Sequence, residues 1–417
     1  MQHIVIVGQG YVGLPLAAVM SRPGVQVSGL DLDATTVSRL NQGISHISDL
    51  SDGDVANMLR NGYSATTDSG VVALADVVII CVPTPLLDSQ RPDLGAIESC
   101  ARSIARNMTA DTLIVLESTT YPGTTEDFLV PILETSGLVN GADFLVAFSP
   151  ERVDPGSAFY GVKNTPKLVG GTSPQATAAA TDFYAQFLDS VVPLSGAKEA
   201  ETAKLLENTY RHVNIALVNE MAKFCHELEI DIWEVIRGAA TKPFGFQAFY
   251  PGPGVGGHCI PIDPNYLSFE VRKKLGYPFR FVELAQEVNN SMPNYVVERI
   301  ADLLNLKGLA LNGAKILLLG VTYKANISDE RESPAVGVAE RLMEKMANVS
   351  YHDPYVPVWA LPSGRLDCVT GLQDAIDAAD LVVLLQAHEL YDLDGIAGRA
   401  STLFDTRGVA PMPAVRL

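Results

Sequence analysis

Residues 3–20, HIVIVGQGYVGLPLAAVM, decide the fold of the first part of this chain. The apolar run 3–7 is typical of a short buried strand, and an apolar helical run follows from residue 14. Between them stands the pattern GQGYVG at 8–13, in which three glycines serve a tight turn, a close approach to a pyrophosphate and helix packing. The order strand, glycine turn and helix predicts the first βαβ unit of a doubly wound sheet.

A second apolar strand, QVSGLDLD at 26–33, contains Asp31 eighteen residues after Gly13. An acidic residue at the end of this strand accepts hydrogen bonds from the ribose hydroxyls and repels a 2′-phosphate. The pattern therefore predicts NAD rather than NADP, and we expect it to be bound by Gly8, Gly10, Tyr11, Val12, Gly13 and Asp31. The alternative is a glycine turn in an α/β domain that binds no dinucleotide.

The strand pattern continues at 77–83, 112–119 and 144–150, with helical stretches between. Alternating strands and helices predict a parallel sheet whose ligands lie at the carboxyl ends of the strands. Three motifs follow these strands and are candidates for ligand contact: CVPTP at 81–85, ESTTYPGTT at 117–125 and SPERVDPG at 149–156.

The rest of the chain divides into a helical part and a second α/β part. From residue 197 more than thirty residues pass without proline or glycine, which predicts a long helix that spans between domains or packs on a second copy. The segments 314–324 and 378–389 resemble the strands of the first part but lack GxGxxG. We expect an α/β protein with two Rossmann-like doubly wound domains joined by a long central helix. The predicted domains are 1–196, 197–307 and 308–417.

Composition narrows the class of protein. The chain has 417 residues, which suggests two or three domains, and a formal net charge of −18, which argues against nucleic acid as a partner. No apolar run has the length of a membrane span, and no cationic segment precedes the first strand, so neither a membrane partner nor a signal peptide is expected. Five cysteines without metal spacing predict reduced thiols in a cytoplasmic enzyme and no metal site.

One cysteine stands in an unusual context, GPGVGGHCIPIDP at 252–264. Glycines before Cys259 allow the backbone to come close to a ligand, and the prolines after it suggest a helix start, where a thiol pKa is lowered. Asp263, four residues on, would share a helical face with the sulfur. We therefore expect Cys259 to be a nucleophile rather than a structural thiol.

Other candidates are less distinctive by themselves. Lys204 and Asn208 are four residues apart in the long helical run and could be a functional pair or a solvated one beside Glu201 and Glu207. Glu151 and Arg152 follow a strand and could bind a ligand or be a surface pair. Thr119, which also follows a strand, could likewise bind a ligand or be a surface residue. Lys324, four residues after Gly320, is a candidate phosphate contact.

Together these motifs resemble the UDP-glucose/GDP-mannose dehydrogenase family over essentially the whole chain. The resemblance implies a nucleophile at Cys259, supported by Asp263, with Lys204 and Asn208 stabilising oxyanions, Glu151 managing protons and Thr119 ordering water. It implies that NAD is also contacted by Pro83, Thr84, Thr119, Lys324 and Arg331. It places the UDP-sugar substrate against Glu151, Arg152, Val153, Lys163, Lys204, Asn208, Arg211, Phe249, Tyr250, Gly254, Gly256 and Lys324.

One departure bears on the substrate. UDP-glucose dehydrogenases have a second glutamate where this chain has Pro155, so the role of that residue is not carried over. The SPERVDPG form and the loop at 241–254 are more similar to the branch that acts on UDP-N-acetylhexosamines, in particular on UDP-N-acetylglucosamine at C6. Four aromatic residues of this loop, Phe244, Phe246, Phe249 and Tyr250, could line the sugar site or merely pack.

The resemblance implies a four-electron oxidation of the sugar C6 hydroxyl to a carboxylate through a cysteine thiohemiacetal and thioester. UDP-glucose is the alternative substrate. A two-electron dehydrogenase and a non-catalytic nucleotide-sugar binder are more distant alternatives. The long helix also predicts a homodimer built on residues 200–228.

Overall fold

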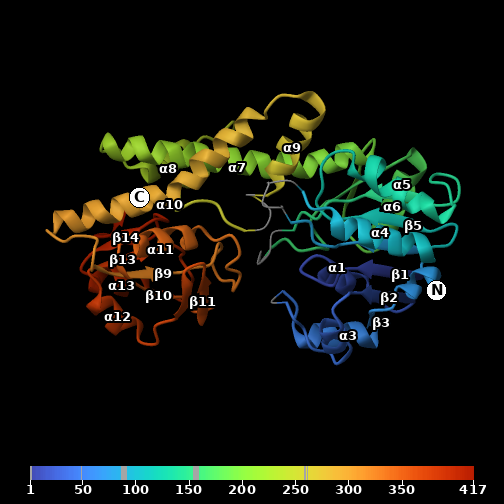
Figure 1. The fold of residues 1–417 in the computed structure, drawn as a ribbon, viewed down its shortest axis with the longest axis horizontal. Coiled ribbons are helices and arrows are strands. Elements are labelled where there is room, and N and C mark those ends of the chain that lie inside the picture. The colour runs from blue at the N-terminus through green and yellow to red at the C-terminus, as the bar shows by residue number, and fades with distance from the viewer. Residues whose placement is uncertain (1, 48, 86–91, 154–158, 258–259, 261) are drawn as a thin grey trace. The chain divides into compact units, whose positions relative to one another are not determined.

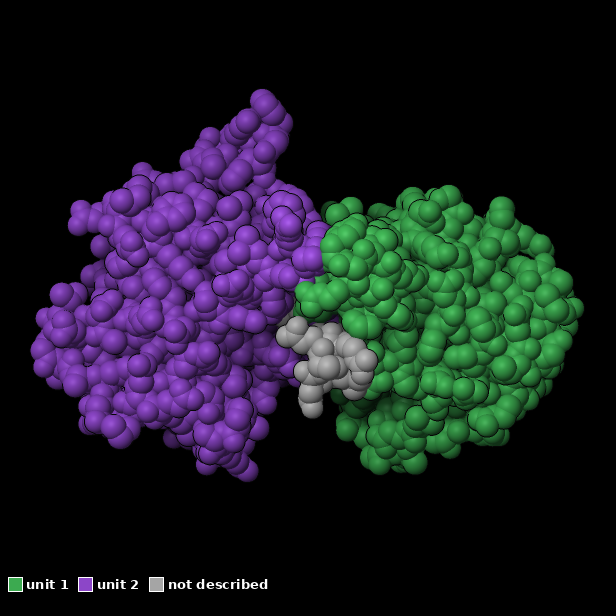
Figure 2. Space-filling view, turned by 45° about the horizontal axis from the view of Figure 1, so that its top comes forward, with its two compact units in different colours: residues 1–207, 265–277 green, residues 208–264, 278–417 purple. Residues whose placement is uncertain are grey.

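The computed structural model describes residues 2–417 except 48, 86–91, 154–158, 258–259 and 261. It separates into two compact units, which Figure 2 shows in different colours. Unit 1 comprises residues 1–207 and 265–277, and unit 2 comprises residues 208–264 and 278–417. Each unit is built on one large, mainly parallel sheet with helices (Figure 1).

Unit 1 is built on an eight-stranded sheet with the order β3-β2-β1-β4-β5-β6-β7-β8. All neighbouring strands are parallel except β6 and β7. The strands are β1 (Gln2–Val7), β2 (Val25–Leu30), β3 (Tyr63–Thr66), β4 (Val77–Ile80), β5 (Leu113–Leu116), β6 (Leu145–Phe148), β7 (Lys167–Gly171) and β8 (Val191–Pro193). The first six strands have the doubly wound order 3-2-1-4-5-6, whose switch point lies between β1 and β4.

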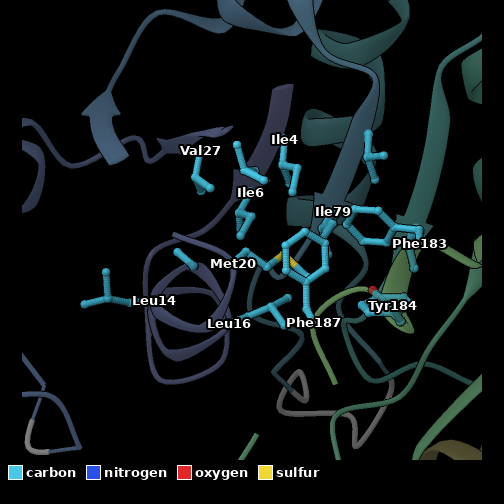
Figure 3. Packing of buried hydrophobic residues seen from close by; sticks show 14 of the residues in the cluster. Ile4, Ile6, Leu14, Leu16, Met20, Val27, Ile79, Phe183, Tyr184 and Phe187 are labelled. Atoms are coloured by element: carbon cyan, nitrogen blue, oxygen red, sulfur yellow. The ribbon is translucent and has the colours of Figure 1, made fainter. Parts of the chain in front are cut away.

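Helices cover both faces of this sheet because alternate strand residues point to opposite faces. Ile4 and Ile6 of β1 face helix α1 and the end of helix α6, where Phe183 and Phe187 complete one core (Figure 3). Val5 belongs to a second core on the other face. The helices are α1 (Gly13–Met20), α2 (Ala34–Asn41), α3 (Asp52–Arg60), α4 (Gly95–Asn107), α5 (Val130–Leu133) and α6 (Pro174–Tyr184), with short helical segments η1 (Ser69–Leu74), η2 (Thr124–Leu129) and η3 (Glu134–Ser136).

Unit 2 contains a five-stranded parallel sheet with the order β10-β9-β13-β14-β15. In chain order this is 2-1-3-4-5, the other common doubly wound arrangement. The strands are β9 (Lys315–Leu319), β10 (Asn348–His352), β13 (Leu381–Leu384), β14 (Leu403–Asp405) and β15 (Val415–Arg416), and a hairpin is formed by β11 (Val358–Leu361) and β12 (Gly364–Asp367). Its helices are α11 (Pro334–Glu344), α12 (Leu372–Ala378) and α13 (Leu393–Arg399).

The segment between the sheets is helical, as expected. Helix α7 (Ala197–Glu227) runs unbroken for 31 residues. It is followed by α8 (Ile232–Ala240), α9 (Asp263–Leu275) and α10 (Arg280–Leu306), which packs on α11. Within the described residues no helix combines the length and the apolar character needed to cross a membrane.

The predicted fold class is confirmed: two doubly wound α/β sheets are joined through the long helix α7. The predicted strands at 77–83, 112–119 and 144–150 correspond to β4, which begins as predicted and ends earlier, and to β5 and β6, which are shorter at both ends. The division into three domains at 196 and 307 stays a prediction.

Candidate active site

The glycine turn of unit 1 lies at the switch point of its sheet. Gly8 follows β1 with φ of 89°, and a Cβ at this position would lie 2.6 Å from the carbonyl oxygen of Cys81. A Cβ on Gly13 would lie 1.9 Å from the carbonyl oxygen of Gly8. Gly10 is exposed, and a Cβ there would meet nothing within 4 Å, so this glycine leaves the turn open to a ligand. Only glycine fits the first and third positions, and the second has the space that a dinucleotide needs.

Asp31 is held in place directly after β2. Its Oδ2 accepts a hydrogen bond from the backbone N–H of Gln9 at 2.8 Å, and its Oδ1 accepts one from that of Asp33 at 2.9 Å. The side chain of Gln9 is itself buried and fixed by Tyr63, whose hydroxyl donates to Oε1 at 2.8 Å. The carboxylate is therefore tied to the glycine turn that precedes it. Tyr11 and Val12 lie in the same turn, at the start of α1. These residues fit an NAD molecule.

The two motifs after β4 and β5 lie side by side. The Ser118 hydroxyl donates to the carbonyl oxygen of Val82 at 2.7 Å. The carbonyl oxygen of the buried Thr84 accepts a hydrogen bond from the Tyr266 hydroxyl of α9, and the adjoining Pro83 is exposed. The predicted contacts Pro83 and Thr84 thus lie at the carboxyl edge of the sheet, where the switch point also lies.

Lys204 meets Thr119 at this edge. The Lys204 Nζ donates to the Thr119 Oγ1 at 2.5 Å, and the Lys204 side chain is buried, with 7% of its residue exposed. Glu201, one turn earlier on α7, is also buried and accepts hydrogen bonds from the backbone N–H groups of Gly123 and Thr125. Lys204 and Glu201 are therefore not solvated, whereas Asn208 is half-buried and Glu207 is exposed, and a functional role of the Lys204–Asn208 pair stays a prediction.

A buried charge cluster lies behind this edge. The Lys167 Nζ is 2.7 Å from Glu117 Oε2 and 3.9 Å from Glu151 Oε2, and the Tyr184 hydroxyl donates to Glu117. Burial alone would lower the pKa of Lys167, but the two carboxylates raise it above its usual value, so the ammonium stays charged. Burial and the neighbouring Glu117 raise the pKa of Cys81 well above that of a free thiol.

Sequence reasoning named Glu117 only as part of the motif at 117–125 and did not single out Lys167, and these two residues form the buried ion pair. Glu117 was visible as the first residue of the ESTT motif, immediately after a strand of apolar residues. Lys167 carried no such signal, because it lies fifty residues away and is placed by the antiparallel strand β7.

The loop after β6 carries three of the predicted substrate contacts. The Glu151 Oε1 accepts a hydrogen bond from the backbone N–H of Val153 at 2.5 Å. The Arg152 guanidinium pairs with Glu207 at 2.7 Å and donates to the carbonyl oxygen of Pro166 at 2.6 Å. Lys163 is exposed and lines a shallow cavity with Arg22 at the end of α1. The substrate roles of these residues stay predictions.

In unit 2 the structure brings together Asn208 and Asp263. The Asn208 Nδ2 donates to the Asp263 Oδ2 at 2.5 Å, and Asp263 is buried at the first residue of α9. A carboxylate in the first turn is favoured by the helix dipole. Cys259 and His258 lie outside the described residues, and so does the expected shared face of Cys259 and Asp263.

The loop before the cysteine is anchored by a buried chain of amides. The backbone N–H of Gly252 donates to Asn219 Oδ1 at 2.9 Å, and Asn219 Nδ2 donates to Asn289 Oδ1 at 2.9 Å. The Asn289 Nδ2 is in turn 3.3 Å from the Nδ1 of His212, which is fully buried on α7. Burial lowers the pKa of His212 to about 4, so the ring is neutral at physiological pH.

The same loop packs closely on the segment that carries Lys324. A Cβ on Gly256 would lie 2.7 Å from Tyr323 Cβ, and one on Gly257 would lie 2.8 Å from the Tyr323 ring. Gly254, with φ of 134°, lies beside Pro334 at the start of α11. These glycines allow two loops of unit 2 to meet next to Lys324.

Two of the four aromatic residues that could line the sugar site pack against helices. Phe249 packs edge-on against Tyr210 of α7 with ring centroids 5.7 Å apart, and Tyr250 stacks on Trp233 of α8 at 6.0 Å. Arg211, also on α7, is exposed. The rings of Phe249 and Tyr250 therefore each pack against a helix. Their contact with the substrate stays a prediction.

Three cations of unit 2 follow strands at the carboxyl edge of the second sheet. Lys324 lies in the loop after β9, and the Arg331 guanidinium pairs with Asp329 at 2.6 Å. Arg407, which sequence reasoning missed, follows β14 and donates through Nε to the carbonyl oxygen of Leu385 at 2.7 Å. Burial lowers the pKa of Arg407 to about 10, which leaves it charged at neutral pH. Its position in the sequence, two residues after a strand, could have marked Arg407 as a candidate ligand contact.

A doubly wound sheet with a glycine turn at its switch point and an acid after the second strand defines an NAD-binding domain. Comparison with protein families identifies which kind of NAD-dependent enzyme contains this domain. The UDP-glucose/GDP-mannose dehydrogenase family matches through its NAD binding domain at residues 2–188, its central domain at 198–291 and its UDP binding domain at 317–411. The chain belongs to this family and is an NAD-dependent nucleotide-sugar dehydrogenase.

Individual relatives are similar over nearly the whole chain. The UDP-N-acetyl-D-mannosamine dehydrogenase of Methanococcus maripaludis is 33% identical over 98% of this chain and 93% of its own length. The NDP-N-acetyl-D-galactosaminuronic acid dehydrogenase of Ralstonia nicotianae is 34% identical over 97% and 96%. The solved structure of UDP-D-ManNAc dehydrogenase from Pyrococcus horikoshii has a TM-score of 0.90 at 32% identity, covering 99% of this chain and 97% of that one.

Proposed function

We propose that this enzyme oxidises the C6 hydroxyl of a UDP-N-acetylhexosamine to a carboxylate in two successive two-electron steps. The observation that carries the proposal is the contact between Lys204 and Thr119. It places a buried ammonium and a hydroxyl together at the carboxyl edge of the NAD-binding sheet, where an alcohol must lie to lose a hydride.

The bound cofactor supplies the hydride acceptor, and Gly8, Gly10, Gly13 and Asp31 would hold it. Lys204 is suited to stabilise negative charge on the C6 oxygen, because its ammonium is desolvated and already oriented by one hydrogen bond. Thr119 then stands where a water molecule can be ordered. Pro83, Thr84 and Arg331 remain proposed contacts of the cofactor.

Asn208 and Asp263 form the second pair of the proposed mechanism. The Asn208 amide can donate to an oxyanion through its second hydrogen, since the first is directed to Asp263. The Asp263 carboxylate can hold or accept a proton during the reaction. Glu151, whose Oε1 is fixed by Val153, is the second proposed proton carrier.

Cys259 is the proposed nucleophile that retains the aldehyde. Addition of its thiolate to C6 gives a thiohemiacetal, the second oxidation converts this to a thioester, and water releases the carboxylate and restores the thiolate. An enzyme that made only an aldehyde would have no need of this sulfur.

Two observations support the proposal that the substrate carries an acetamido group at C2. The chain has Pro155 where UDP-glucose dehydrogenases have a second glutamate. Two curated relatives that match over more than nine-tenths of both lengths, at 33% and 34% identity, are named for N-acetylated sugars, whereas a solved UDP-glucose dehydrogenase of similar coverage is 28% identical. The sequence favoured UDP-N-acetylglucosamine, and the names of the relatives add UDP-N-acetylmannosamine as a candidate substrate. The proposed substrate contacts are those predicted from the sequence, with Arg407 added as a cation of the nucleotide site.

A substrate panel tests the proposal. UDP-N-acetylglucosamine, UDP-N-acetylmannosamine, UDP-N-acetylgalactosamine, UDP-glucose and GDP-mannose are each supplied with excess NAD, and NADH and product mass are measured. Two NADH per sugar and a carboxylate product are expected for an N-acetylated UDP-sugar. One NADH per sugar would indicate a two-electron dehydrogenase, and faster oxidation of UDP-glucose than of every N-acetylated sugar would refute the substrate class.

A matched pair of lysine variants tests the observation on which the proposal rests. Lys204→Met should lower kcat by at least a hundredfold, about 2.7 kcal/mol, because it removes the buried ammonium. Lys198→Met is the control, since Lys198 lies on the same helix but is half exposed and pairs with Glu126. Equal activity of the two variants would contradict the role of Lys204.

The proposed enzyme is a homodimer that associates through α7. Tyr210, Leu217 and Phe224 recur every seven residues on this helix, and 48%, 53% and 45% of their surfaces are exposed. Residues at this spacing form one stripe along a helix. We propose that these residues pack against the same helix of a second copy of the protein.

A further inference from the structure

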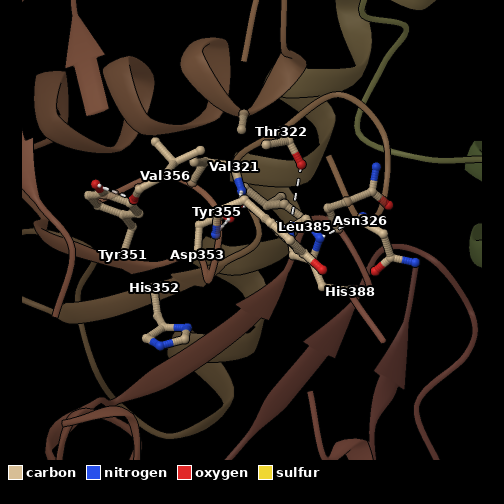
Figure 4. A network of polar contacts seen from close by, with 12 residues as sticks. Val321, Thr322, Asn326, Tyr351, His352, Asp353, Tyr355, Val356, Leu385 and His388 are labelled. Carbon is tan, nitrogen blue, oxygen red and sulfur yellow. Dashed lines mark hydrogen bonds and ion pairs between the residues drawn. The ribbon is translucent and has the colours of Figure 1, made fainter. Parts of the chain in front are cut away.

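A buried polar network holds the loop that carries Lys324 at both of its ends (Figure 4). Asp353 follows β10, and its Oδ2 accepts a hydrogen bond from the backbone N–H of Val321 at 2.7 Å. His388 follows β13, and its Nδ1 accepts one from the backbone N–H of Asn326 at 2.9 Å. Both side chains are fully buried. The loop 321–326 is therefore anchored from the two strands that flank β9.

These contacts determine the tautomer of His388. A backbone N–H can only donate, so Nδ1 must present a lone pair to Asn326. The ring hydrogen is then on Nε2, which faces Asp353 Oδ2 at 3.0 Å and donates to it. A protonated or Nδ1–H imidazole would set a hydrogen against the Asn326 N–H. The two contacts are therefore compatible with one form of the His388 ring, the neutral tautomer that carries its hydrogen on Nε2.

The anchored loop is also held by the side chains of its own residues. Asn326 has φ of 64°, in the left-handed region, and its side-chain Oδ1 accepts a hydrogen bond from the backbone N–H of Glu389 at 2.8 Å. The Thr322 hydroxyl donates to the carbonyl oxygen of Lys324 at 2.8 Å. Lys324 is therefore carried on a short loop with a fixed start, a fixed end and an internal brace.

We infer that His388 is a positioning residue for Lys324, and that it sets the affinity of the enzyme for the diphosphate of its nucleotide ligand. The inference rests on the proposed phosphate contact of Lys324. His388 does not touch the ligand in this account; it acts through the backbone of Asn326.

Two variants separate the contacts of the two ring nitrogens, Nδ1 with Asn326 and Nε2 with Asp353 and, at 3.4 Å, with the Thr322 hydroxyl. In His388→Asn the amide oxygen occupies the place of Nδ1 and keeps the contact with Asn326. In His388→Gln the amide nitrogen occupies the place of Nε2 and keeps the contact with Asp353. Both variants remove the ring, and they differ from each other by one methylene group. Titration calorimetry of the full chain with UDP should show a Kd at least tenfold higher for His388→Gln, and at most threefold higher for His388→Asn.

Equal UDP affinities of both variants, whether weakened or not, would overturn the inference. Lys324→Ala distinguishes this failure from failure of the proposed function. If Lys324→Ala binds UDP as tightly as the wild type, the proposed phosphate contact is wrong. If Lys324→Ala binds weakly and His388→Gln binds normally, the contact stands and the positioning role of His388 is wrong.

A second test reads the state of the ring in the wild-type protein. The chain has seven histidines, so selective ¹⁵N labelling of histidine gives a spectrum in which tautomers are distinguishable. His388→Asn is used only to assign the signal. A neutral ring with hydrogen on Nε2 is expected, and a charged ring or an Nδ1–H tautomer would overturn the inference.

Discussion

Acidification should destabilise this protein through His212, a histidine with no exposed surface. Its Nδ1 faces the Asn289 side chain, and its Nε2 has no hydrogen-bond partner among the described residues. Burial lowers its pKa from 6.5 to about 4, because no nearby carboxylate compensates the desolvation of the imidazolium. Protonation would place a charge in a dry site and disturb the amide chain that holds Gly252.

The sign and size of the effect follow from linkage. A base whose pKa is lower in the folded protein stabilises that state above the unfolded pKa, and this stability is lost as the pH falls from about 6.5 toward about 4. At 1.36 kcal/mol per pKa unit, the full difference is about 3 kcal/mol below pH 4. At pH 5 the loss should be about 2 kcal/mol of the free energy of unfolding.

Urea unfolding at pH 8 and pH 5 measures this loss in the wild type and in His212→Asn. Asparagine keeps an acceptor near the Nδ1 position and does not titrate, so the variant should lose about 2 kcal/mol less than the wild type over this range. His226→Asn is the control, because His226 is exposed on the same helix and its substitution should leave most of the pH dependence in place. Equal losses in the wild type and in His212→Asn would refute the reasoning.

Four further predictions concern the cofactor, the buried charges, the nucleophile and assembly. The wild type should prefer NAD to NADP at least tenfold in kcat/KM, about 1.4 kcal/mol, and Asp31→Ser should reduce that preference; equal efficiency of the wild type with both cofactors would contradict the role of Asp31. Lys167→Met should lower the free energy of unfolding by about 3–5 kcal/mol, because it leaves Glu117 buried without its cation, and adding Glu117→Gln should restore part of the loss in urea unfolding. Cys259→Ser should stop after at most one oxidation, so near-normal steady-state NADH production would exclude the covalent route. Leu217→Glu should shift a dimer toward monomer in sedimentation velocity at micromolar concentration, and a wild type that sediments as a monomer would refute the interface.

The sequence by itself determined the features that depend on local geometry. The turn at Gly8 and Gly13 was predictable because only glycine tolerates such close approach to backbone atoms, and that requirement is written into residue type and spacing. The strands were predictable because buried parallel strands are continuous apolar runs. Asp31 was predictable because its position follows from the strand that precedes it.

Only the tertiary structure decided which distant side chains meet. Lys204 could be a solvated lysine on a helix until the fold set it against Thr119, eighty-five residues away. Lys167 gave no signal because its partner is chosen by the antiparallel β7, and His388 gave none because its two hydrogen bonds come from different loops. Periodicity specifies which face of an element is buried, but it carries no information about register between elements. The partners of buried polar groups are therefore fixed only when the strands and helices pack.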